Sequence, residues 1–483
     1  MSTTWSIIVG LFIAFEWMLR VVMLFVVPKN RRPSSATAWL MLIMLEPAIG
    51  TILFATLGNP HLPKLRMLMQ KHADAHIAQE LSEHNLEKAG VDVPVRELTE
   101  HNEQFIKLNQ ALGGLPVMGG NGVRFLEDYQ QSIDELIKDI NGAKQRILFE
   151  FFIVALDETT IPVWEALEAA VQRGVDVRVL FDGVVSRHYP NFRQLKKRLT
   201  AAGIKWKPML PINLKPGKHF TRPDLRNHRK IVVIDGIIGY TGSQNIVDKT
   251  YHRSDELYYE ELVARVTGPV VWQLAAIFRA DWYAETREFL PQDPIAERSG
   301  NVAAQVLPSG PGHGGSSNLK LYTSLMHSAE KKIVIVTPYF VPDDALLTAL
   351  TSAAERGVEV TIINSEIIDK LLVGHAQRSY YSELLKVGIK IYLYKTPVFL
   401  HSKHVTIDDD VAVIGSSNLD IRSFELDQEV TLVMYDKKVV QQLRKIEHRY
   451  AANSSQVNPY SWARRPFYLQ SLDTLARLTA VLQ

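Results

Sequence analysis

The sequence of 483 residues contains no cysteine. A chain without cysteine has no disulfide, no thiolate metal ligand and no cysteine nucleophile. A strong charge of one sign is also missing, because 54 lysines and arginines face 52 aspartates and glutamates. A nuclease would favour a basic face along the nucleic-acid phosphates, so this balance argues against a nucleic-acid partner. The length allows two or three domains with a large buried core.

Long apolar runs, by contrast, are present, and they gather at the amino terminus. Residues 5–27 and 36–57 form two such runs, each about as long as a helix that crosses a bilayer. No basic segment precedes the first run and no small-residue cleavage site follows it, so it does not resemble a signal peptide. We therefore expect a transmembrane helical hairpin over residues 1–58, with both ends on the same side. Lysines and arginines are balanced around the runs and leave the orientation open.

Both runs carry charged residues. Glu16 and Arg20 are four residues apart, so they share a helix face and can pair. Glu46 precedes Pro47, where a helix would kink. We expect these charges to face the hairpin partner or another protein rather than lipid.

Residues 59–115 are polar with a helical pattern, and we expect a helical linker there. After it, "RILFEFFIV" (146–154) predicts a strand, "PVWEALEAAVQRG" (162–174) a helix and "VDVRVLFD" (175–182) a second strand, which together form a βαβ unit. The order returns later, and "EAAVQRGVDVRVLF" (168–181) is similar to "TSAAERGVEVTIIN" (351–364). This is an internal repeat.

The repeat contains two copies of one polar motif. "RNHRKIVVIDGIIGYTGSQN" spans residues 226–245, and "LHSKHVTIDDDVAVIGSSN" spans residues 400–418. Six special positions match with a constant separation of 173 residues, from 228 to 401 onward. The pairs are His228 and His401, Lys230 and Lys403, Asp235 and Asp408, Gly242 and Gly415, Ser243 and Ser416, and Asn245 and Asn418. A single HxK means little, but two gapless copies inside a βαβ repeat are very specific.

The paired motifs resemble the HKD motifs of the phospholipase D superfamily. Together with "RRPSSATAW" (31–39), "VTPYFVPD" (336–343) and "GSSNLDIRSFELDQE" (415–429), they are similar to the bacterial cardiolipin synthase branch over nearly the whole chain. The resemblance implies an α/β fold with two phospholipase D-like domains related by a pseudo-twofold axis. We place these domains at residues 116–295 and 296–483, the second with an amphipathic carboxyl-terminal tail. One active site would lie between them, with one motif from each.

The residue types fit phosphodiester chemistry. Residues two apart on a strand face the same side, so His228 projects with Lys230, and His401 with Lys403. Two ammonium groups, with the hydroxyls of Ser243 and Ser416 and the amides of Asn245 and Asn418, would bind the phosphate oxygens. One histidine can attack phosphorus while the other moves the proton, and we provisionally take His228 as the nucleophile. No metal or other cofactor is needed.

Two further pairs of acidic residues follow from the resemblance. Glu261 and Glu429 occupy similar places after the two motifs and are expected to orient the histidines. Asp235 and Asp408 belong to the motif and are expected among the catalytic residues, although they fall on the opposite strand face and could instead brace a turn. The segment "YYEE" leaves the Glu261 assignment open by one residue, and Asp427 replaces the family's usual asparagine.

The resemblance implies a membrane-bound phosphatidyltransferase. It would join two phosphatidylglycerol molecules into cardiolipin and release glycerol through a phosphohistidine, as a multi-pass protein of the bacterial cytoplasmic membrane. A phospholipase D-type hydrolase, or a transferase with another alcohol acceptor, would use the same residues. A nuclease and a non-catalytic membrane scaffold are the remaining alternatives, and two intact motifs argue against the scaffold.

Two other patterns stay open. The arginines Arg222, Arg226 and Arg229 could contact lipid phosphate or lie on a plain surface. A leucine stripe near the carboxyl end could lie on a membrane or, more commonly, pack onto the catalytic core. Its members are Leu469, Leu472, Leu475, Leu478 and Leu482.

Overall fold

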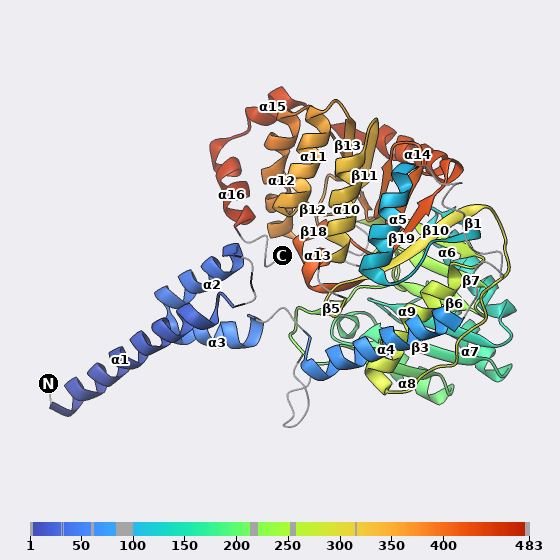
Figure 1. Cartoon of the computed structure of the whole chain (residues 1–483), viewed down its shortest axis with the longest axis horizontal. Coiled ribbons are helices and arrows are strands. Elements are labelled where there is room, and N and C mark those ends of the chain that lie inside the picture. The colour runs from blue at the N-terminus through green and yellow to red at the C-terminus, as the bar shows by residue number, and fades with distance from the viewer. Residues whose placement is uncertain are drawn as a thin grey trace. The chain divides into compact units, whose positions relative to one another are not determined.

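The chain divides into a small amino-terminal unit (Met1–His61 with Arg222–Asp224) and a large α/β unit (Leu62–Thr221 and Leu225–Gln483) (Figure 1). The structure is a computed structural model. It describes residues 3–29, 31, 33–58, 62–83, 100–212, 221–251, 257–313 and 316–478. Parts of the expected linker over 59–115 therefore lie outside the described residues, as does Leu482.

The small unit is built from three apolar helices, α1 (Thr3–Val26), α2 (Pro33–Leu45) and α3 (Pro47–Leu57). Within the described residues, α1 is the one helix long and apolar enough to cross a membrane, from Trp5 to Val26. Its side chains are mostly exposed, as lipid-facing ones would be. Arg20 lies 3.5 Å from Glu16, so the predicted pairing of these two residues is confirmed.

The second apolar run is not the single helix expected over residues 36–57. Glu46 leaves the helical conformation, with φ −133° and ψ 86°, and Pro47 starts a new helix. Gly50 packs so closely that an added Cβ would lie 2.8 Å from the Cα of Ile43, which brings α2 and α3 side by side. At 1.5 Å per residue each is roughly 17–20 Å long, shorter than the ~30 Å hydrocarbon core.

The large unit begins with two helices and then forms its first α/β half. The elements of this half are α4 (Lys64–Glu83), α5 (Glu100–Gly113), β1 (Met118–Leu126), α6 (Tyr129–Gly142), β2 (Arg146–Phe151), α7 (Ile161–Gln172), β3 (Asp176–Asp182), α8 (Phe192–Ala201), β4 (Lys205–Met209), β5 (Arg226–Asn227), β6 (Ile231–Ile234), β7 (Ile238–Gly242), β8 (Tyr258–Glu260), β9 (Val263–Thr267) and α9 (Val271–Thr286).

The second half repeats this plan and adds helices at its end. Its elements are β10 (Val302–Ser309), α10 (Ser317–Ser328), β11 (Lys332–Val336), β12 (Phe340–Val341), α11 (Asp344–Glu355), β13 (Glu359–Ser365), α12 (Leu371–Lys386), β14 (Lys390–Tyr394), β15 (Val398–Leu400), β16 (His404–Ile407), β17 (Val411–Gly415), β18 (Leu419–Asp420), α13 (Ile421–Glu425), β19 (Asp427–Tyr435), α14 (Lys437–Ala452), β20 (Ser454–Gln456), α15 (Pro459–Ala463) and α16 (Phe467–Arg477).

One sheet runs through both halves. Its strands follow the order β20-β14-β13-β11-β16-β17-β19-β10-β1-β9-β7-β6-β2-β3-β4, and β5 pairs with β19. In the first half β2 is parallel to β3 and antiparallel to β6, and in the second β11 is parallel to β13 and antiparallel to β16. The matching pairing confirms the predicted repeat and its βαβ units.

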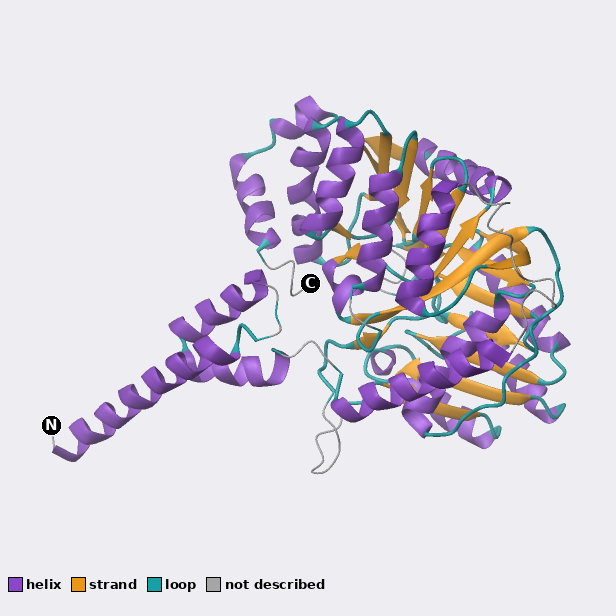
Figure 2. Cartoon of the chain, in the orientation of Figure 1, coloured by secondary structure: helices purple, strands orange, loops and turns teal. Residues whose placement is uncertain are grey.

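Helices cover both faces of this sheet (Figure 2), because its strands are apolar on both sides. Ile147 and Phe149 point into one core cluster, while Leu148 between them points into the other, as the two-residue period of a strand requires. Short polar side chains start several helices. Asp128 accepts a hydrogen bond from the Gln131 amide at 2.7 Å, and Asp436 one from Val439 at 2.9 Å, which satisfies amides at the helix start.

Candidate active site

Two short parallel ladders bring the motifs of the two halves together. β5 leads into His228 and pairs with the start of β19, and the His228 amide donates to the Gln428 carbonyl at 2.8 Å. β15 leads into His401 and pairs with β8, and the His401 amide donates to the Glu260 carbonyl at 2.8 Å. Each histidine therefore lies beside the strand of the other half that ends in a candidate glutamate.

The histidine–glutamate pairs are formed crosswise. The Nδ1 atom of His228 lies 3.0 Å from both carboxylate oxygens of Glu429. The Nδ1 atom of His401 lies 2.8 and 2.9 Å from those of Glu261. An Nδ1–H donated to a carboxylate leaves Nε2 as the reactive nitrogen. Glu261, rather than Glu260, is thus the residue that contacts a histidine.

The two lysines lie beneath the histidines in buried positions. Nζ of Lys230 donates to the His228 carbonyl at 2.7 Å, and Nζ of Lys403 donates to the His401 carbonyl at 2.7 Å. Burial lowers the pKa of Lys230 to about 8, against the opposing attraction of Glu429 and Glu261. Burial also lowers the pKa of Lys403 to about 7, although Glu261 acts in the opposite direction.

The two histidine–glutamate pairs differ electrostatically. Burial, followed by the charges of Lys230 and Lys403, lowers the pKa of His228 well below its usual range. Burial lowers the pKa of His401 to about 4, with Glu261 opposing. Burial raises the pKa of Glu429. Burial acts the same way on Glu261, but interaction with His401 outweighs it and holds that pKa below its ordinary value. The first histidine is therefore the more firmly neutral of the two.

The motif serines support the glutamates. The Ser416 hydroxyl donates to the Glu429 carboxylate and accepts from the Val430 amide at 3.0 Å. The Ser243 hydroxyl accepts from the Leu262 amide at 2.9 Å, and its hydrogen bond to Glu261 helps to lower the pKa of that carboxyl. These contacts hold the carboxylates that orient the histidines, and phosphate binding by the serines stays a prediction.

The motif asparagines differ in their contacts. The Asn245 side-chain oxygen accepts from the Ile153 amide at 3.2 Å. The Asn418 side-chain oxygen is buried and has no hydrogen-bond partner among the described residues. Both asparagines are buried beside the motif strands, and their contact with phosphate also stays a prediction.

The motif aspartates brace turns instead of joining the histidines. The Asp235 carboxylate accepts from the amides of residues 144–146 at 2.8–2.9 Å, and Asp408 accepts from those of residues 330–332 at 2.7–2.9 Å. Both residues adopt positive φ, 52° and 47°, which is typical of a tight hairpin turn. Of the two roles expected for these residues, the contacts favour bracing over catalysis.

Sequence reasoning did not foresee the aromatic rings around the histidines. Phe152 meets the His228 ring edge-on at 4.6 Å, and Tyr259 meets the His401 ring at 5.5 Å. The two aromatics lie in separate strands and loops, so no motif spacing marks them.

The neighbouring arginines are internal, and the expected surface or lipid-phosphate role is wrong for two of them. Arg226 bonds to Asp182. Arg229 has no exposed surface, bonds to Asp281 and donates from Nε to the Glu429 carbonyl at 3.0 Å. Arg229 thereby fixes the backbone of the residue that holds His228.

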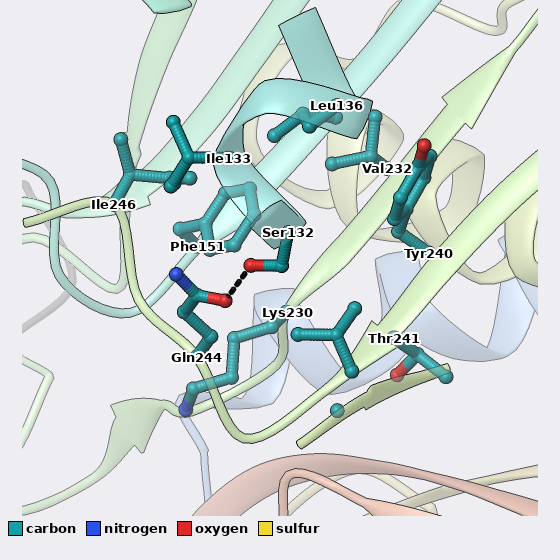
Figure 3. Close-up of a pocket in the computed structure, with 12 residues that line it drawn as sticks. Ser132, Ile133, Leu136, Phe151, Lys230, Val232, Tyr240, Thr241, Gln244 and Ile246 are labelled. Atoms are coloured by element: carbon teal, nitrogen blue, oxygen red, sulfur yellow. Dashed lines mark hydrogen bonds between the residues drawn. The ribbon is translucent and has the colours of Figure 1, made fainter. Parts of the chain in front are cut away.

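A small cavity lies beside Lys230 in the first half (Figure 3). It is lined mostly by apolar residues of α6, β6 and β7, such as Ile133, Val232 and Tyr240, and its volume is about 30 Å³. That space suits one or two water molecules. It is too small for a lipid headgroup, so it serves as a gap in the core beneath the lysine stem.

Two fused α/β halves that each supply an HxK strand to one buried centre define the chain as a phospholipase D-like protein. A family model described as "Cardiolipin synthase, PLD-like domain" matches residues 136–282 and 322–450. The chain belongs to this cardiolipin synthase family, and the resemblance seen in the sequence is confirmed.

Relatives align over nearly the full length. Cardiolipin synthase A of Proteus mirabilis is 34% identical, with 98% of this chain and 98% of the relative covered. Cardiolipin synthase A of Wigglesworthia glossinidia brevipalpis is 32% identical, with 97% and 94% covered. Among solved structures, phosphatidylserine synthase of Haemophilus influenzae Rd KW20 matches with a TM-score of 0.59 and 17% identity, covering 78% of this chain and 99% of that one. The last match shows a shared fold.

Proposed function

We propose that the enzyme transfers a phosphatidyl group from one phosphatidylglycerol to the free glycerol hydroxyl of another, giving cardiolipin and glycerol. The observation that supports this most is the crossed pair of histidines, each held at Nδ1 by a glutamate of the opposite half. The full-length similarity to proteins named cardiolipin synthase A supports the choice of lipid.

In the first step Nε2 of His228 attacks phosphorus and the bond to the departing glycerol breaks. His401 gives its Nε2 proton to that glycerol oxygen, so a phosphatidyl-histidine and neutral glycerol result. An anionic phosphodiester beside His401 favours its protonated form, as Glu261 already does. The stronger depression of the His228 pKa supports its role as the neutral nucleophile.

In the second step the hydroxyl of another phosphatidylglycerol attacks phosphorus while His401 takes its proton. The bond from His228 to phosphorus breaks, and both histidines return to their starting state. One phosphodiester replaces another, so no nucleotide is consumed. Lys230 and Lys403 supply positive charge to the phosphate oxygens throughout, and water has to be kept out until the second lipid arrives.

The enzyme is proposed to act in the bacterial cytoplasmic membrane, with α1 as one crossing. Two phospholipase D-like domains, at 116–295 and 296–483, would hold the site. The sequence prediction of a second crossing depends on α2 and α3, which are too short individually to span.

The direct test uses the purified enzyme in vesicles with phosphatidylglycerol alone, and mass spectrometry of the products. Cardiolipin and glycerol in equal amounts, lost in His228→Ala and in His401→Ala, are the expected result. Phosphatidic acid as the main product would make the enzyme a hydrolase. An absolute need for another alcohol would make it a transferase with a different acceptor.

A further inference from the structure

The last helix that the structure describes packs onto the large unit through its polar side. α16 lies against α12 (Figure 1), and Asp473 at the contact is only 2% exposed. Its carboxylate lies 2.7 Å from Nδ1 of His375, 2.9 Å from Arg465 and 3.5 Å from Arg378. A charged cluster, rather than an apolar stripe, thus attaches this helix to the protein.

The opposite side of α16 is apolar and exposed. At 100° per residue its members fall within an arc of roughly 140°. They are Phe467 (83% exposed), Tyr468 (64%), Leu472 (47%), Leu475 (60%) and Leu478 (78%). A surface helix of a water-soluble protein shows the reverse arrangement, with the apolar stripe toward the core. Packing onto the core, the commoner expectation for this leucine stripe, is therefore wrong for three of its members, and Leu469 is half-buried.

The charges around this arc have one sign. Arg464, Arg465 and Arg477 are the basic residues between positions 459 and 478, and Asp473 is the one acidic residue there, already paired in the contact with α12. Tyr460 in α15 adds a further aromatic ring that is 72% exposed. Aromatic and aliphatic side chains flanked by arginines are typical of a helix that lies in the interface of an anionic bilayer.

The helix beneath α16 also reaches toward the histidines. α12 starts at Leu371 and Leu372, which are 75% and 57% exposed. Lys370, directly before them, is among the charges that lower the pKa of His228, after burial and the nearer lysines. An apolar, basic edge therefore adjoins the centre that a membrane lipid has to enter.

We propose that the exposed face of α16, with Tyr460 and the start of α12, is a docking surface that seats the large unit on a bilayer of anionic phospholipid. We name Phe467, Tyr468, Leu472, Leu475 and Leu478 the α16 face. Docking would present the centre to lipids without their leaving the membrane. The identity of those lipids as substrate rests on the proposed function, whereas the docking itself does not.

The first test uses the absence of cysteine. Leu475→Cys in the full chain is labelled with a polarity-sensitive dye and reconstituted into vesicles of phosphatidylglycerol and phosphatidylcholine that carry quenchers on their acyl chains. The matched control is Ile237→Cys, an aliphatic residue 56% exposed in the turn between β6 and β7. We expect at least threefold stronger lipid quenching at 475 than at 237. Equal quenching would overturn the proposal. So would a dye at 475 that lipid does not quench and aqueous iodide cannot reach, because protein would then cover the face.

The second test separates docking from chemistry. Leu472→Ser with Leu475→Ser should lower turnover of phosphatidylglycerol in vesicles about tenfold, while turnover of a short-chain phosphatidylglycerol dissolved as monomers stays within twofold of the unmodified enzyme. Ile237→Ser should change neither rate. Equal losses on both substrates would overturn the proposal. If the unmodified enzyme makes no cardiolipin from either substrate, the proposed function fails, and the quenching test still decides the docking.

Discussion

At the scale of single residues, the two histidines have the same contacts but different surroundings. Glu261 keeps a low pKa beside His401, whereas the pKa of Glu429 beside His228 is raised by burial. An ionised glutamate stabilises an imidazolium, so His401 suits proton donation and His228 suits attack. This asymmetry can be tested with a substrate whose leaving group needs no proton.

We expect His401→Ala to release about one equivalent of p-nitrophenolate from phosphatidyl-p-nitrophenol and then stop. The first step needs no acid with this leaving group, but the second step lacks its base. Mass spectrometry should find the phosphatidyl group on the peptide that contains His228. With phosphatidylglycerol the same variant should lose at least 10²–10⁴-fold in rate, roughly the contribution of general acid–base catalysis. His228→Ala should release nothing, and a phosphatidyl group on His401 in that variant would reverse the assignment.

The lysines predict how activity changes with pH. A lysine is charged below its pKa and loses that charge as the pH rises through it. With pKa values of about 7 for Lys403 and about 8 for Lys230, kcat/KM should start to fall near pH 7. Lys403→Arg should move this fall to near pH 8, with a lower maximum, because arginine stays charged. A matched control is Lys390→Arg, a lysine 3.0 Å from Glu359 that should leave the profile unchanged. An unmoved profile in Lys403→Arg would contradict this origin.

Local reasoning identified the polar residues of the centre but not their pairing. The repeat marks His228, Lys230, His401 and Lys403, since chance does not preserve six matched positions at one spacing. The pairing of His228 with Glu429 joins residues 201 positions apart and depends on β5 lying beside β19. No motif encodes that register, so the crossed arrangement appears only in the folded protein.

At the scale of secondary-structure elements, the hairpins after the motif strands explain the aspartates. Asp235 and Asp408 each satisfy three backbone amides that precede β2 and β11. A carboxylate in this position joins two strands of the sheet, and its matched copy in each half shows that the repeat preserves a structural device as well as the centre.

Asp235→Ala should therefore destabilise the fold far more than it slows the reaction. Loss of three charge-assisted hydrogen bonds should cost about 2–4 kcal/mol, with a thermal midpoint lower by roughly 5 °C. The fraction that stays folded should turn over substrate at a rate within about threefold of the unmodified enzyme. Asp408→Ala should behave alike. If turnover instead falls by about a hundredfold or more while the midpoint is unchanged, the aspartates belong to the chemistry.

Another element-scale feature was visible in the sequence but received too little weight. Glu46 and Pro47 predict a kink, yet the apolar composition of residues 36–57 favoured one continuous span. Proline removes a helical hydrogen bond, and Gly50 permits the close approach of the following helix to Ile43. Hydropathy alone does not report either effect, so the run was expected to be one helix instead of two.

At the scale of the whole molecule, the break between α2 and α3 changes the expected path through the membrane. One crossing by α1 places the start of the chain and Lys29 on opposite sides. Two short antiparallel helices then return the chain to the side that it left, whereas one continuous helix would cross back. We therefore expect the chain near Thr56, at the end of α3, to lie on the same side as Lys29.

Single cysteines in this chain without natural cysteine can measure that path in sealed vesicles. Thr3→Cys, Lys29→Cys and Thr56→Cys would each be treated with a thiol reagent that does not cross the membrane, before and after detergent is added. We expect positions 29 and 56 to react alike and position 3 to react oppositely, because α2 and α3, at roughly 20 and 17 Å, fall short of the ~30 Å hydrocarbon core. If positions 3 and 56 react alike while 29 differs, the segment opens into a second crossing, and the two-span arrangement predicted from hydropathy is correct.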